Sequence, residues 1–477
     1  MENNNLRKTK IVCTMGPASL DEQVIENMLR SGMNVARFNF SHGTHEYHRE
    51  GIELFKKVRD KLKMPAAVLL DTKGPEIRIG SFSKGSITLA EGAEFTLSAD
   101  DADGDENHVS ITYKELYKEL NVGSRVLIDD GRLELSVKRI EGSDIVCRVV
   151  TGGQLSSKKG INLPNLHLNM PYISDRDEQD LRFGIEMDVD FVAASFVRSK
   201  EDVIALRKLL NYYGGHRIKI ISKIENIEGV ENFDEILAHS DGIMVARGDM
   251  GVEIEFEKLP GLQKKFIRKC YQSGKMVITA TQMLETMIHS LTPTRAEITD
   301  VANAVFDGTS AVMLSGETAM GDHPAHVVKV MARIAEQAER DALEMGKYDG
   351  VRYDIDTSDM TNAICDAACT TARDIHAKAI IAVTKSGTTA RRVSKFRPSE
   401  AIVAATPDKK TYHQLSLSWG VSPVLALDQD DTDSLFLHAI DCARQLDIVS
   451  GGDKVVITAG VPLKLSGTTN LLKVQVV

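Results

Sequence analysis

The chain has 477 residues with 42% hydrophobic and 26% charged residues, a composition typical of a folded globular protein of more than one domain. Its net charge of -10 and the lack of a long Lys/Arg block argue against a nucleic acid or an anionic membrane as partner. No apolar run reaches the roughly 18 residues that a membrane span needs, and the polar start MENNNLRKTK lacks a secretory signal. We therefore expect a cytoplasmic protein.

Three short apolar segments open the chain, separated by amphipathic stretches such as DEQVIENMLR. They are residues 10–16 (KIVCTMG), 34–40 (NVARFNF) and 66–72 (AAVLLDT). Apolar, β-branched runs of this length are typical of buried strands, and helical periodicity between them indicates strand–helix units.

The pattern then changes over residues 73–168. Turn-punctuated, β-rich sequence such as SITLAEGAEFTLSA and RVLIDDGRLELSVKRIEGSDIVCRVV replaces the alternation. This change predicts an inserted all-β domain after the third strand, built as a small β-barrel or sandwich.

The alternation of strands and helices resumes after the insertion. Five more strand segments follow, at residues 191–196, 219–225, 242–247, 276–282 and 311–317. Together the two flanks supply eight strands, which predicts an α/β (β/α)8 TIM barrel over residues 1–72 and 169–344. Active sites of this fold lie at the C-terminal ends of the strands. The inserted domain would then form a lid over the active site.

A second α/β unit is predicted at the end of the chain, after a polar linker near residues 348–359. Its strand segments are AKAIIAVT, AIVAAT, PVLAL, KVVITAG and LLKVQVV. We place this C-terminal α/β domain at residues 345–477.

Polar residues gather where the predicted barrel strands end. They are Arg37, Asn39, Ser41, Asp71, Thr72, Glu225, Asp249 and Thr281. Strand ends of a closed barrel meet on one face, so we expect these side chains to converge there.

Lys223 and Glu225 are the strongest chemical signal. Residues two apart in a strand point to the same face, so this cation and this anion are directed together. Asp249 lies between glycines at an expected helix start, where free N–H groups favour an anion. A lysine, two carboxylates and backbone donors suit metal-assisted phosphoryl chemistry.

With these residues in place, the chain resembles the pyruvate kinases over essentially its whole length. The matching blocks, in order, are NFSHG, LLDTKGPEIR, KKGINLP, IISKIENIEGV, MVARGDMGVEI, ITATQML, PTRAE, DVANAVFDGTSAVMLSGETA and SGTTN. The resemblance implies an ATP:pyruvate phosphotransferase that moves the phosphoryl group of phosphoenolpyruvate to ADP, giving ATP and pyruvate in the last step of glycolysis.

The resemblance also implies roles for single residues. Lys223, Thr281 and Arg37 would be catalytic, and Arg37, Lys223, Gly248, Asp249 and Thr281 would bind the substrate. Glu225 and Asp249 would hold Mg²⁺ or Mn²⁺. A threonine hydroxyl has too high a pKa to protonate an enolate alone, so we expect an ordered water network around Thr281.

Nucleotide and K⁺ sites are implied in the same way. Arg78 and Lys159 would contact ADP or ATP together with Asn39 and His42, although a turn histidine is as often structural. The K⁺ ligands would be Asn39, Ser41, Asp71 and Thr72. Glu76 strengthens this expectation, because an acidic residue there accompanies K⁺ dependence in the family whereas a lysine replaces the cation.

The segment TKSGTTAR follows a strand and opens an expected helix in the last domain. Such a turn binds phosphate or simply caps the helix. It resembles the effector loop of sugar-phosphate-regulated members, with Thr384, Lys385, Ser386, Thr388 and Thr389 as contacts. AGVPLKLSGTTN lacks the tryptophan and arginine of some fructose bisphosphate binders, so the effector stays open: fructose 1,6-bisphosphate, a sugar monophosphate or neither.

The resemblance further implies a homotetramer of the bacterial type. Because the chain ends at Val477, we expect no extra C-terminal phosphohistidine-like domain. Two other classes of protein are alternatives. A dikinase-like or aldolase-like barrel lyase should carry a phosphorylatable histidine domain or lack the nucleotide lysine and the K⁺ residues. A catalytically silent sugar-phosphate sensor would keep TKSGTTAR and lose Lys223, Glu225 or Asp249, but all three are present.

Overall fold

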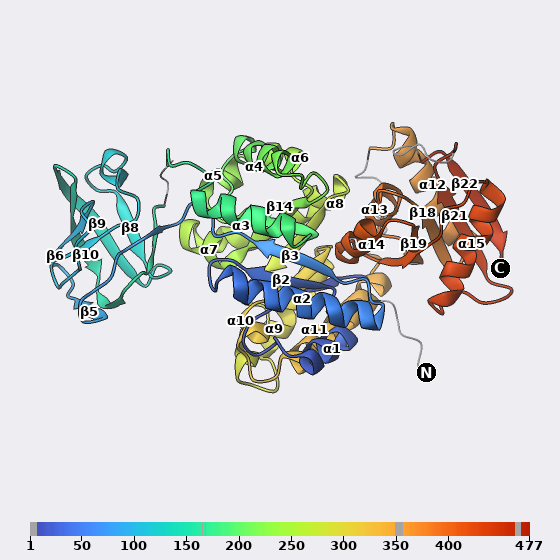
Figure 1. Cartoon of the computed structure of the whole chain (residues 1–477), viewed down its shortest axis with the longest axis horizontal. Coiled ribbons are helices and arrows are strands. Elements are labelled where there is room, and N and C mark those ends of the chain that lie inside the picture. Colours follow the sequence, from blue (N-terminus) through green and yellow to red (C-terminus); the bar gives the residue numbers. More distant parts are fainter. Residues whose placement is uncertain (1–6, 165, 167, 349–355, 463–468) are drawn as a thin grey trace.

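The computed structural model describes residues 7–164, 166, 168–348, 356–462 and 469–477. Three parts follow one another along the long axis of the molecule (Figure 1). The inserted β domain lies at one end, the barrel in the middle and the C-terminal α/β domain at the other end. Most of the linker predicted near residues 348–359 and residues 463–468 of AGVPLKLSGTTN lie outside the described residues.

Eight parallel strands close into a barrel in the order β1-β17-β16-β15-β14-β13-β3-β2, which confirms the predicted fold. All eight predicted strand segments contain one of them. The strands are β1 (Lys10–Thr14), β2 (Val35–Asn39), β3 (Ala67–Asp71), β13 (Phe191–Ala194), β14 (Lys219–Ile224), β15 (Gly242–Ala246), β16 (Met276–Ala280) and β17 (Ala311–Leu314).

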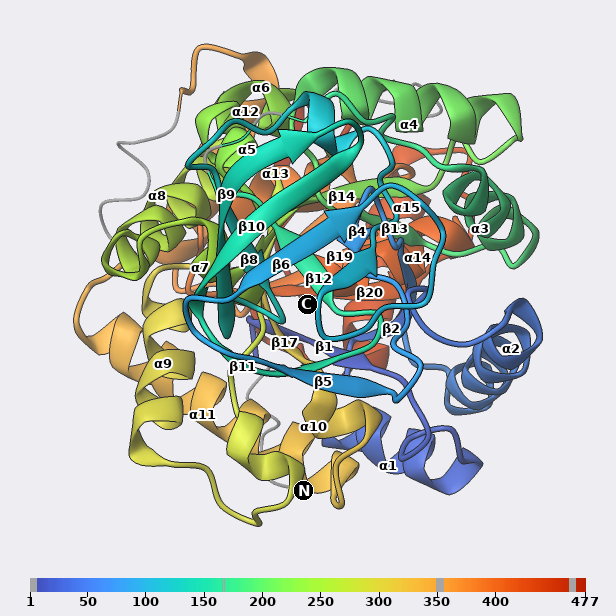
Figure 2. The same cartoon turned by 90° about the vertical axis from the view of Figure 1, so that its left-hand side faces the viewer.

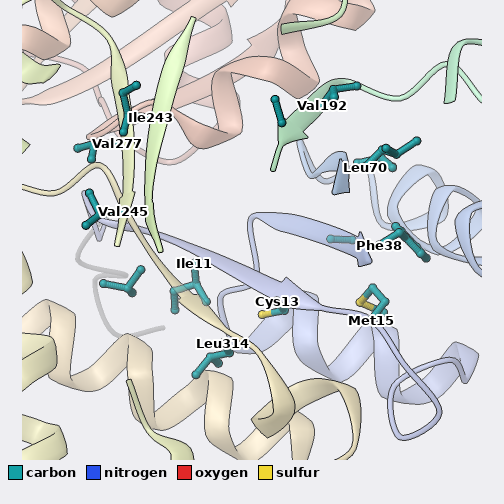
Figure 3. Packing of buried hydrophobic residues seen from close by; sticks show 14 of the residues in the cluster. Ile11, Cys13, Met15, Phe38, Leu70, Val192, Ile243, Val245, Val277 and Leu314 are labelled. Atoms are coloured by element: carbon teal, nitrogen blue, oxygen red, sulfur yellow. The ribbon is translucent and has the colours of Figure 1, made fainter. Parts of the chain in front are cut away.

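Successive residues of each barrel strand face the barrel interior and the helices in turn. Val12 belongs to the interior cluster, whereas its neighbours Ile11 and Cys13 belong to the larger cluster that the helices cover. Figure 3 shows this outer layer, where side chains from several strands meet the surrounding helices. Burial on both faces explains why the strands are nearly continuous apolar runs.

The described barrel helices surround the strands. They are α1 (Glu22–Ser31), α2 (His45–Leu62), α3 (Asp175–Glu186), α4 (Lys200–Tyr212), α5 (Ile227–Glu231), α6 (Phe233–His239), α7 (Arg247–Glu253), α8 (Leu259–Gln272), α9 (Arg295–Phe306), α10 (Gly316–Ala319) and α11 (Pro324–Glu344), with 3-10 turns at Phe256–Lys258 and Glu285–Ile288. Ser174 and Thr294 start α3 and α9 with reciprocal capping boxes. Among the described residues, none of the helices is both long and apolar enough to cross a membrane.

The insertion leaves the barrel after β3 and forms a sheet of order β4-β12-β8-β9-β10-β6-β7, with a separate pair β11-β5. Its strands are β4 (Ile77–Arg78), β5 (Ser86–Leu89), β6 (Glu94–Ser98), β7 (His108–Ser110), β8 (Arg125–Ile128), β9 (Leu133–Glu141), β10 (Asp144–Thr151), β11 (Gly153–Ser156) and β12 (Gly160–Asn162), and a 3-10 turn spans Leu116–Lys118. A bridge between Ile79 and Ile111 joins the two edges of the large sheet. Because the insertion begins at the end of β3, it stands over the C-terminal ends of the barrel strands (Figure 2).

The C-terminal part is a five-stranded sheet of order β20-β19-β18-β21-β22, in which only the β21–β22 pairing is antiparallel. Its strands are β18 (Ala379–Val383), β19 (Ala401–Thr406), β20 (Val421–Leu425), β21 (Lys454–Ala459) and β22 (Leu471–Val476). Its described helices are α12 (Met360–Asp374), α13 (Thr388–Lys395), α14 (Lys409–Gln414) and α15 (Thr432–Gln445), with a 3-10 turn at Leu415–Leu417. All five predicted strand segments overlap these strands.

Candidate active site

A buried ion-pair cluster occupies the C-terminal ends of β2, β3 and β14. Lys223 Nζ lies 3.1 Å from Asp71 Oδ1 and 3.0 Å from Glu225 Oε1. Arg37 Nε lies 2.5 Å from Asp71 Oδ2, and its Nη1 donates to Thr14 Oγ1 at 2.8 Å. Arg37 and Asn39 belong to β2, and Asp71 is the last residue of β3. The structure thus brings Arg37, Asp71, Lys223 and Glu225 together, as convergence at one barrel face requires.

The charges of this cluster are unevenly compensated. Burial alone would lower the pKa of Lys223, but Asp71 and Glu225 outweigh it and raise that pKa above its ordinary value. Burial opposes ionisation of Asp71, yet Arg37 and Lys223 lower its pKa. Burial raises the pKa of Glu225 to about 7, since Lys223 offsets only part of it and Asp249 adds negative charge. A further cation beside Glu225 would keep that carboxyl ionised.

Ser195 is a contact of this cluster that the sequence reasoning missed. It follows β13, and its Oγ lies 2.7 Å from Lys223 Nζ and 3.2 Å from Asp71 Oδ1. The next residue, Phe196, donates its backbone N–H to Glu225 Oε2 at 2.6 Å. A signal was present, because Ser195 is a polar residue directly after a barrel strand, as Glu225 and Thr281 are.

The start of α7 and the end of β16 form the second half of the site. Gly248 N donates to Thr281 Oγ1 at 2.8 Å. Thr281 and Gln282 both have left-handed backbones, with φ of 67° and 54°, which is costly for residues with side chains. Arg247 holds this turn by donating to Ala280 O and Thr281 O at 3.2 and 2.6 Å. The turn thereby places the hydroxyl oxygen of Thr281 where it accepts from the amide of Gly248.

Glu225 and Asp249 fit a hard divalent cation. Both offer carboxylate oxygens, which are preferred ligands of Mg²⁺. Burial raises the pKa of Glu225 and Asp249 adds to that rise, so a cation bound between the two carboxyls would favour their ionised forms. Among the residues that the structure describes, no group of three or more His, Cys, Asp or Glu could hold a metal. Mg²⁺ commonly keeps several waters and substrate oxygens beside one or two carboxylates. A two-carboxylate set is therefore sufficient.

The four residues expected at a K⁺ site are close in the fold. Asn39 pairs in register with Asp71 across β2 and β3. Asn39 Oδ1 accepts from Ser41 N at 3.1 Å. Thr72 follows β3 directly, and its carbonyl accepts from Ser195 Oγ at 2.6 Å. The oxygens of this set are neutral amide, hydroxyl and carbonyl oxygens together with one carboxylate, that of Asp71. A set with a single negative charge suits a monovalent cation.

The expected nucleotide residues are spread over two parts of the molecule. In the inserted domain, Arg78 pairs with Glu76 at 2.6 Å, and Lys159 pairs with Asp129 at 2.7 Å. His42 is exposed on the barrel, after β2. Within the described part of the chain, Lys223 forms its hydrogen bonds and ion pairs with Asp71, Ser195 and Glu225, and not with any of these three residues. A cavity of about 80 Å³ lies between the inserted domain and the barrel, and its wall includes Glu76, Asp130, Phe196 and Asp249.

The expected effector loop connects β18 to α13. Lys385 and Ser386 are exposed, and Ser386 Oγ lies 3.0 Å from Thr388 Oγ1. Gly387 precedes α13 with a φ of 80°, and Arg391 donates to Ser386 O at 2.9 Å. The other two expected contacts, Thr384 and Thr389, are buried, and Thr389 Oγ1 lies 2.9 Å from Thr469 Oγ1. Hydroxyls and a lysine thus surround the start of the helix, on the other side of the barrel from the inserted domain (Figure 1).

Comparison with known proteins gives consistent matches. The family model described as "Pyruvate kinase, barrel domain" matches residues 6–328, and that described as "Pyruvate kinase, alpha/beta domain" matches residues 362–475. A pyruvate kinase of Clostridium acetobutylicum is 48% identical over 473 residues, covering 99% of this chain and 100% of the relative. Pyruvate kinases of Staphylococcus epidermidis and Staphylococcus aureus are also 48% identical over 474 residues, covering 99% of this chain and 81% of each relative.

Proposed function

The chain belongs to the pyruvate kinase family, and on that premise we propose that it transfers the phosphoryl group of phosphoenolpyruvate to ADP, giving pyruvate and ATP. The observation that carries the proposal is the buried cluster in which Lys223 lies 3.1 Å from Asp71 and 3.0 Å from Glu225. Phosphoryl transfer depends mainly on positioning and on neutralising charge. This cluster supplies both.

Lys223 and Arg37 are the cations that act on the transferring group. The ammonium of Lys223 is fixed by two carboxylates and by Ser195, so it needs no reorganisation when charge develops on the phosphoryl or enolate oxygens. Arg37 is held by Asp71 through Nε and presents a planar fork suited to phosphate. Their shared partner, Asp71, keeps both cations in place.

Glu225 and Asp249 would hold the divalent cation, Mg²⁺ or Mn²⁺. When bound, such an ion neutralises phosphate and enolate oxygens during transfer. The carboxyl of Glu225, whose pKa burial raises to about 7, supplies an anion that the ion would stabilise. Phe196 N–H orients it by donating to Oε2 at 2.6 Å.

Gly248 and Thr281 would bind the carboxylate of phosphoenolpyruvate. In the structure the Gly248 amide donates to the Thr281 hydroxyl at 2.8 Å. A carboxylate oxygen of the substrate would take the amide, at the start of α7 where N–H groups favour an anion, and would accept from the hydroxyl. Thr281 is thus a positioning and binding group, and protonation of the enolate needs water beside it.

The remaining roles follow the same resemblance. K⁺ would bind among Asn39, Ser41, Asp71 and Thr72, and the nucleotide would contact Asn39, His42, Arg78 and Lys159. A sugar phosphate would bind at Thr384, Lys385, Ser386, Thr388 and Thr389, and the protein would act as a cytoplasmic homotetramer. We further propose three domains, at residues 1–72 with 169–344, 73–168 and 345–477.

The test is a coupled assay that follows pyruvate formation from phosphoenolpyruvate and ADP. We expect turnover that requires a divalent cation and K⁺. The matched blank contains a large organic monovalent cation in place of K⁺, at equal ionic strength. Absence of pyruvate formation under all ionic conditions would overturn the proposed function.

A further inference from the structure

The loop after β13, residues 195–198, contacts both the active-site cluster and the two linkers to the inserted domain; we call it the β13 loop. Two of its residues contact the cluster. Ser195 Oγ lies 2.7 Å from Lys223 Nζ, and Phe196 N donates to Glu225 Oε2 at 2.6 Å. Phe196 has a φ of 53°, a left-handed conformation that costs energy for a bulky residue. This conformation directs its amide at Glu225.

The same loop holds the linker that leaves the barrel toward the inserted domain. Ser195 N donates to Thr72 Oγ1 at 3.1 Å, and Ser195 Oγ donates to Thr72 O at 2.6 Å. A Cβ at Gly74 would lie 2.9 Å from both Ser195 Cβ and Ser195 O. The absence of a side chain at Gly74 therefore lets the outgoing linker lie against the β13 loop.

Arg198 holds the linker that returns from the inserted domain. Its Nη1 donates to Leu168 O and Met170 O at 2.9 and 3.0 Å. Asp202 fixes the guanidinium from behind, accepting from Nε at 3.2 Å and from Nη2 at 3.3 Å. One nitrogen of a rigid, anchored guanidinium thus holds two carbonyls of the returning chain.

Phe196 and Arg198 also form part of the wall between the inserted domain and the barrel. They line the cavity of about 80 Å³ that includes Glu76 of the outgoing linker and Asp249 of α7. The β13 loop is therefore at the junction of the inserted domain, its two linkers and the residues expected to bind metal and substrate.

We propose that the β13 loop is a positioning element that couples the placement of the inserted domain to the placement of Lys223 and Glu225. The inference rests on the proposed function only in taking these two residues as the site of ligand binding. Coupling between two sites is reciprocal. A ligand that fixes the positions of Lys223 and Glu225 should therefore also change the mobility of the linkers. Conversely, loosening the linkers should weaken the binding of that ligand. Ser195 and Arg198 are positioning residues in this scheme.

Hydrogen–deuterium exchange of the full chain tests the coupling directly. Exchange is followed in peptides covering the linkers, residues 72–77 and 168–173, with and without Mg²⁺ and phosphoenolpyruvate and without ADP. In the wild type we expect the ligands to slow exchange in both linkers several-fold. In Arg198→Met, which loses both carbonyl contacts, we expect this protection to be lost from the returning linker, together with a rise in the KM for phosphoenolpyruvate larger than the fall in kcat.

Arg207→Met is the matched control. Arg207 makes the same kind of contacts in α4, donating to Ile218 O at 2.7 Å and to Asp241 at 2.6 Å, but it contacts neither linker. The control should keep the ligand-induced protection. Protection that survives in Arg198→Met, is lost equally in Arg207→Met, or never occurs in the wild type would overturn the proposal.

Arg198→Lys separates the coupling from a general loss of folding. A single ammonium keeps the charge beside Asp202 and can donate to the carbonyls, but it cannot at the same time reproduce the Nε and Nη2 contacts with Asp202 that hold the guanidinium. We therefore expect partial loss of protection with an unchanged melting temperature. A lysine variant with full protection would contradict the proposal. An active wild type without linker protection rejects the coupling alone, whereas an inactive wild type rejects the proposed function.

Discussion

The ion-pair cluster of the barrel and the loop of residues 384–389 both carry cations and hydroxyls, and both are proposed to bind phosphate, but they are built differently. In the barrel, Lys223 is buried and lies within 3.1 Å of two carboxylates. In the loop, Lys385 and Ser386 are exposed, and the nearest partner of the Ser386 hydroxyl is Thr388 at 3.0 Å. A fixed charge stabilises developing charge without reorganisation, whereas an exposed loop binds an anion at little cost to folding. Substitutions should therefore affect the two regions very unequally.

Replacing Lys223 should have the largest effect. Lys223→Met removes the only cation that contacts both Asp71 and Glu225 among the described residues, and loss of one preorganised charge costs about 10²–10³ in rate. Turnover is measured in the coupled assay. Lys219→Met is the control, because Lys219 lies on the same strand and pairs with Asp241 at 3.0 Å, away from the cluster. Near-wild-type turnover of Lys223→Met would contradict the assigned role.

Lys223→Met also tests how much the compensation of charge in the buried cluster contributes to the stability of the fold. Removing one partner of a buried ion pair leaves an uncompensated charge and typically costs about 3–5 kcal/mol of stability. We therefore expect a lower melting temperature for Lys223→Met than for Lys219→Met. Circular dichroism separates this loss of stability from a loss of fold.

The proposed metal ligands should come next. Glu225→Gln and Asp249→Asn each remove one anionic ligand, so we expect weaker binding of divalent metal, measured with Mn²⁺ by electron paramagnetic resonance on the protein without substrate. Glu253→Gln is a control, since Glu253 is a half-buried carboxyl that lines the same cavity as Asp249 and accepts from Asn162 Nδ2 at 3.4 Å. Unchanged Mn²⁺ affinity in both ligand variants would exclude these residues as the metal site.

The expected K⁺ requirement can be tested by a substitution that adds activity in the absence of K⁺. Glu76→Lys places an ammonium where Glu76 now pairs with Arg78 at 2.6 Å, and a tethered positive charge can replace a bound cation near the phosphoryl group. We expect activity that is partly independent of K⁺ in the coupled assay. Glu76→Gln removes the carboxylate without adding a cation and should keep the K⁺ requirement. Equal K⁺ dependence of Glu76→Lys and wild type would reject the idea.

The pH dependence of stability should report on Glu225. Its folded pKa of about 7 lies above the ordinary value of 4.5, so the folded state holds the proton more tightly than the unfolded state. The resulting stabilisation is complete below pH 4.5 and is lost as pH rises toward 7, with a slope of up to about 1.4 kcal/mol per pH unit. Urea unfolding at several pH values in EDTA measures it.

Two comparisons isolate this contribution. Glu225→Gln lacks the titrating group, so its stability should fall less than that of the wild type between pH 5 and 7. On the proposed metal site, Mg²⁺ would bind the ionised carboxyl and should also flatten the wild-type slope. Parallel curves for wild type and Glu225→Gln would show that the Glu225 pKa is not raised.

The sequence predicted the barrel strands and their polar ends because the periodicity of apolar residues and the apolar runs of buried strands are local signals. Lys223 lies in β14 and Glu225 directly follows this strand, two positions on in the sequence. The register of β2 with β3 explains why Asn39 and Asp71 are neighbours. Contacts across the chain were not predictable. Ser195 contacts Asp71 over 124 positions, and a lone serine after a strand carries no sign of its partner. The same holds for Arg198 and the returning linker, whose contacts depend on how the inserted domain is seated.

The smallest effect on basal catalysis should come from the loop of residues 384–389. Ser386→Ala combined with Lys385→Glu replaces two exposed side chains and leaves Lys223, Glu225 and Asp249 untouched. An anion bound there can influence the barrel only by favouring one domain or subunit arrangement, a coupling of typically about 1–3 kcal/mol. We expect sigmoidal phosphoenolpyruvate saturation that fructose 1,6-bisphosphate or glucose 6-phosphate makes more hyperbolic in the wild type and not in the double variant.

Ser399→Ala with Lys378→Glu makes the same chemical changes at exposed positions of the same domain and should keep the response. Activation that survives in the loop variant would place the effector elsewhere, and loss of basal activity together with activation would mean that this loop, unlike an independent regulatory site, is needed for folding.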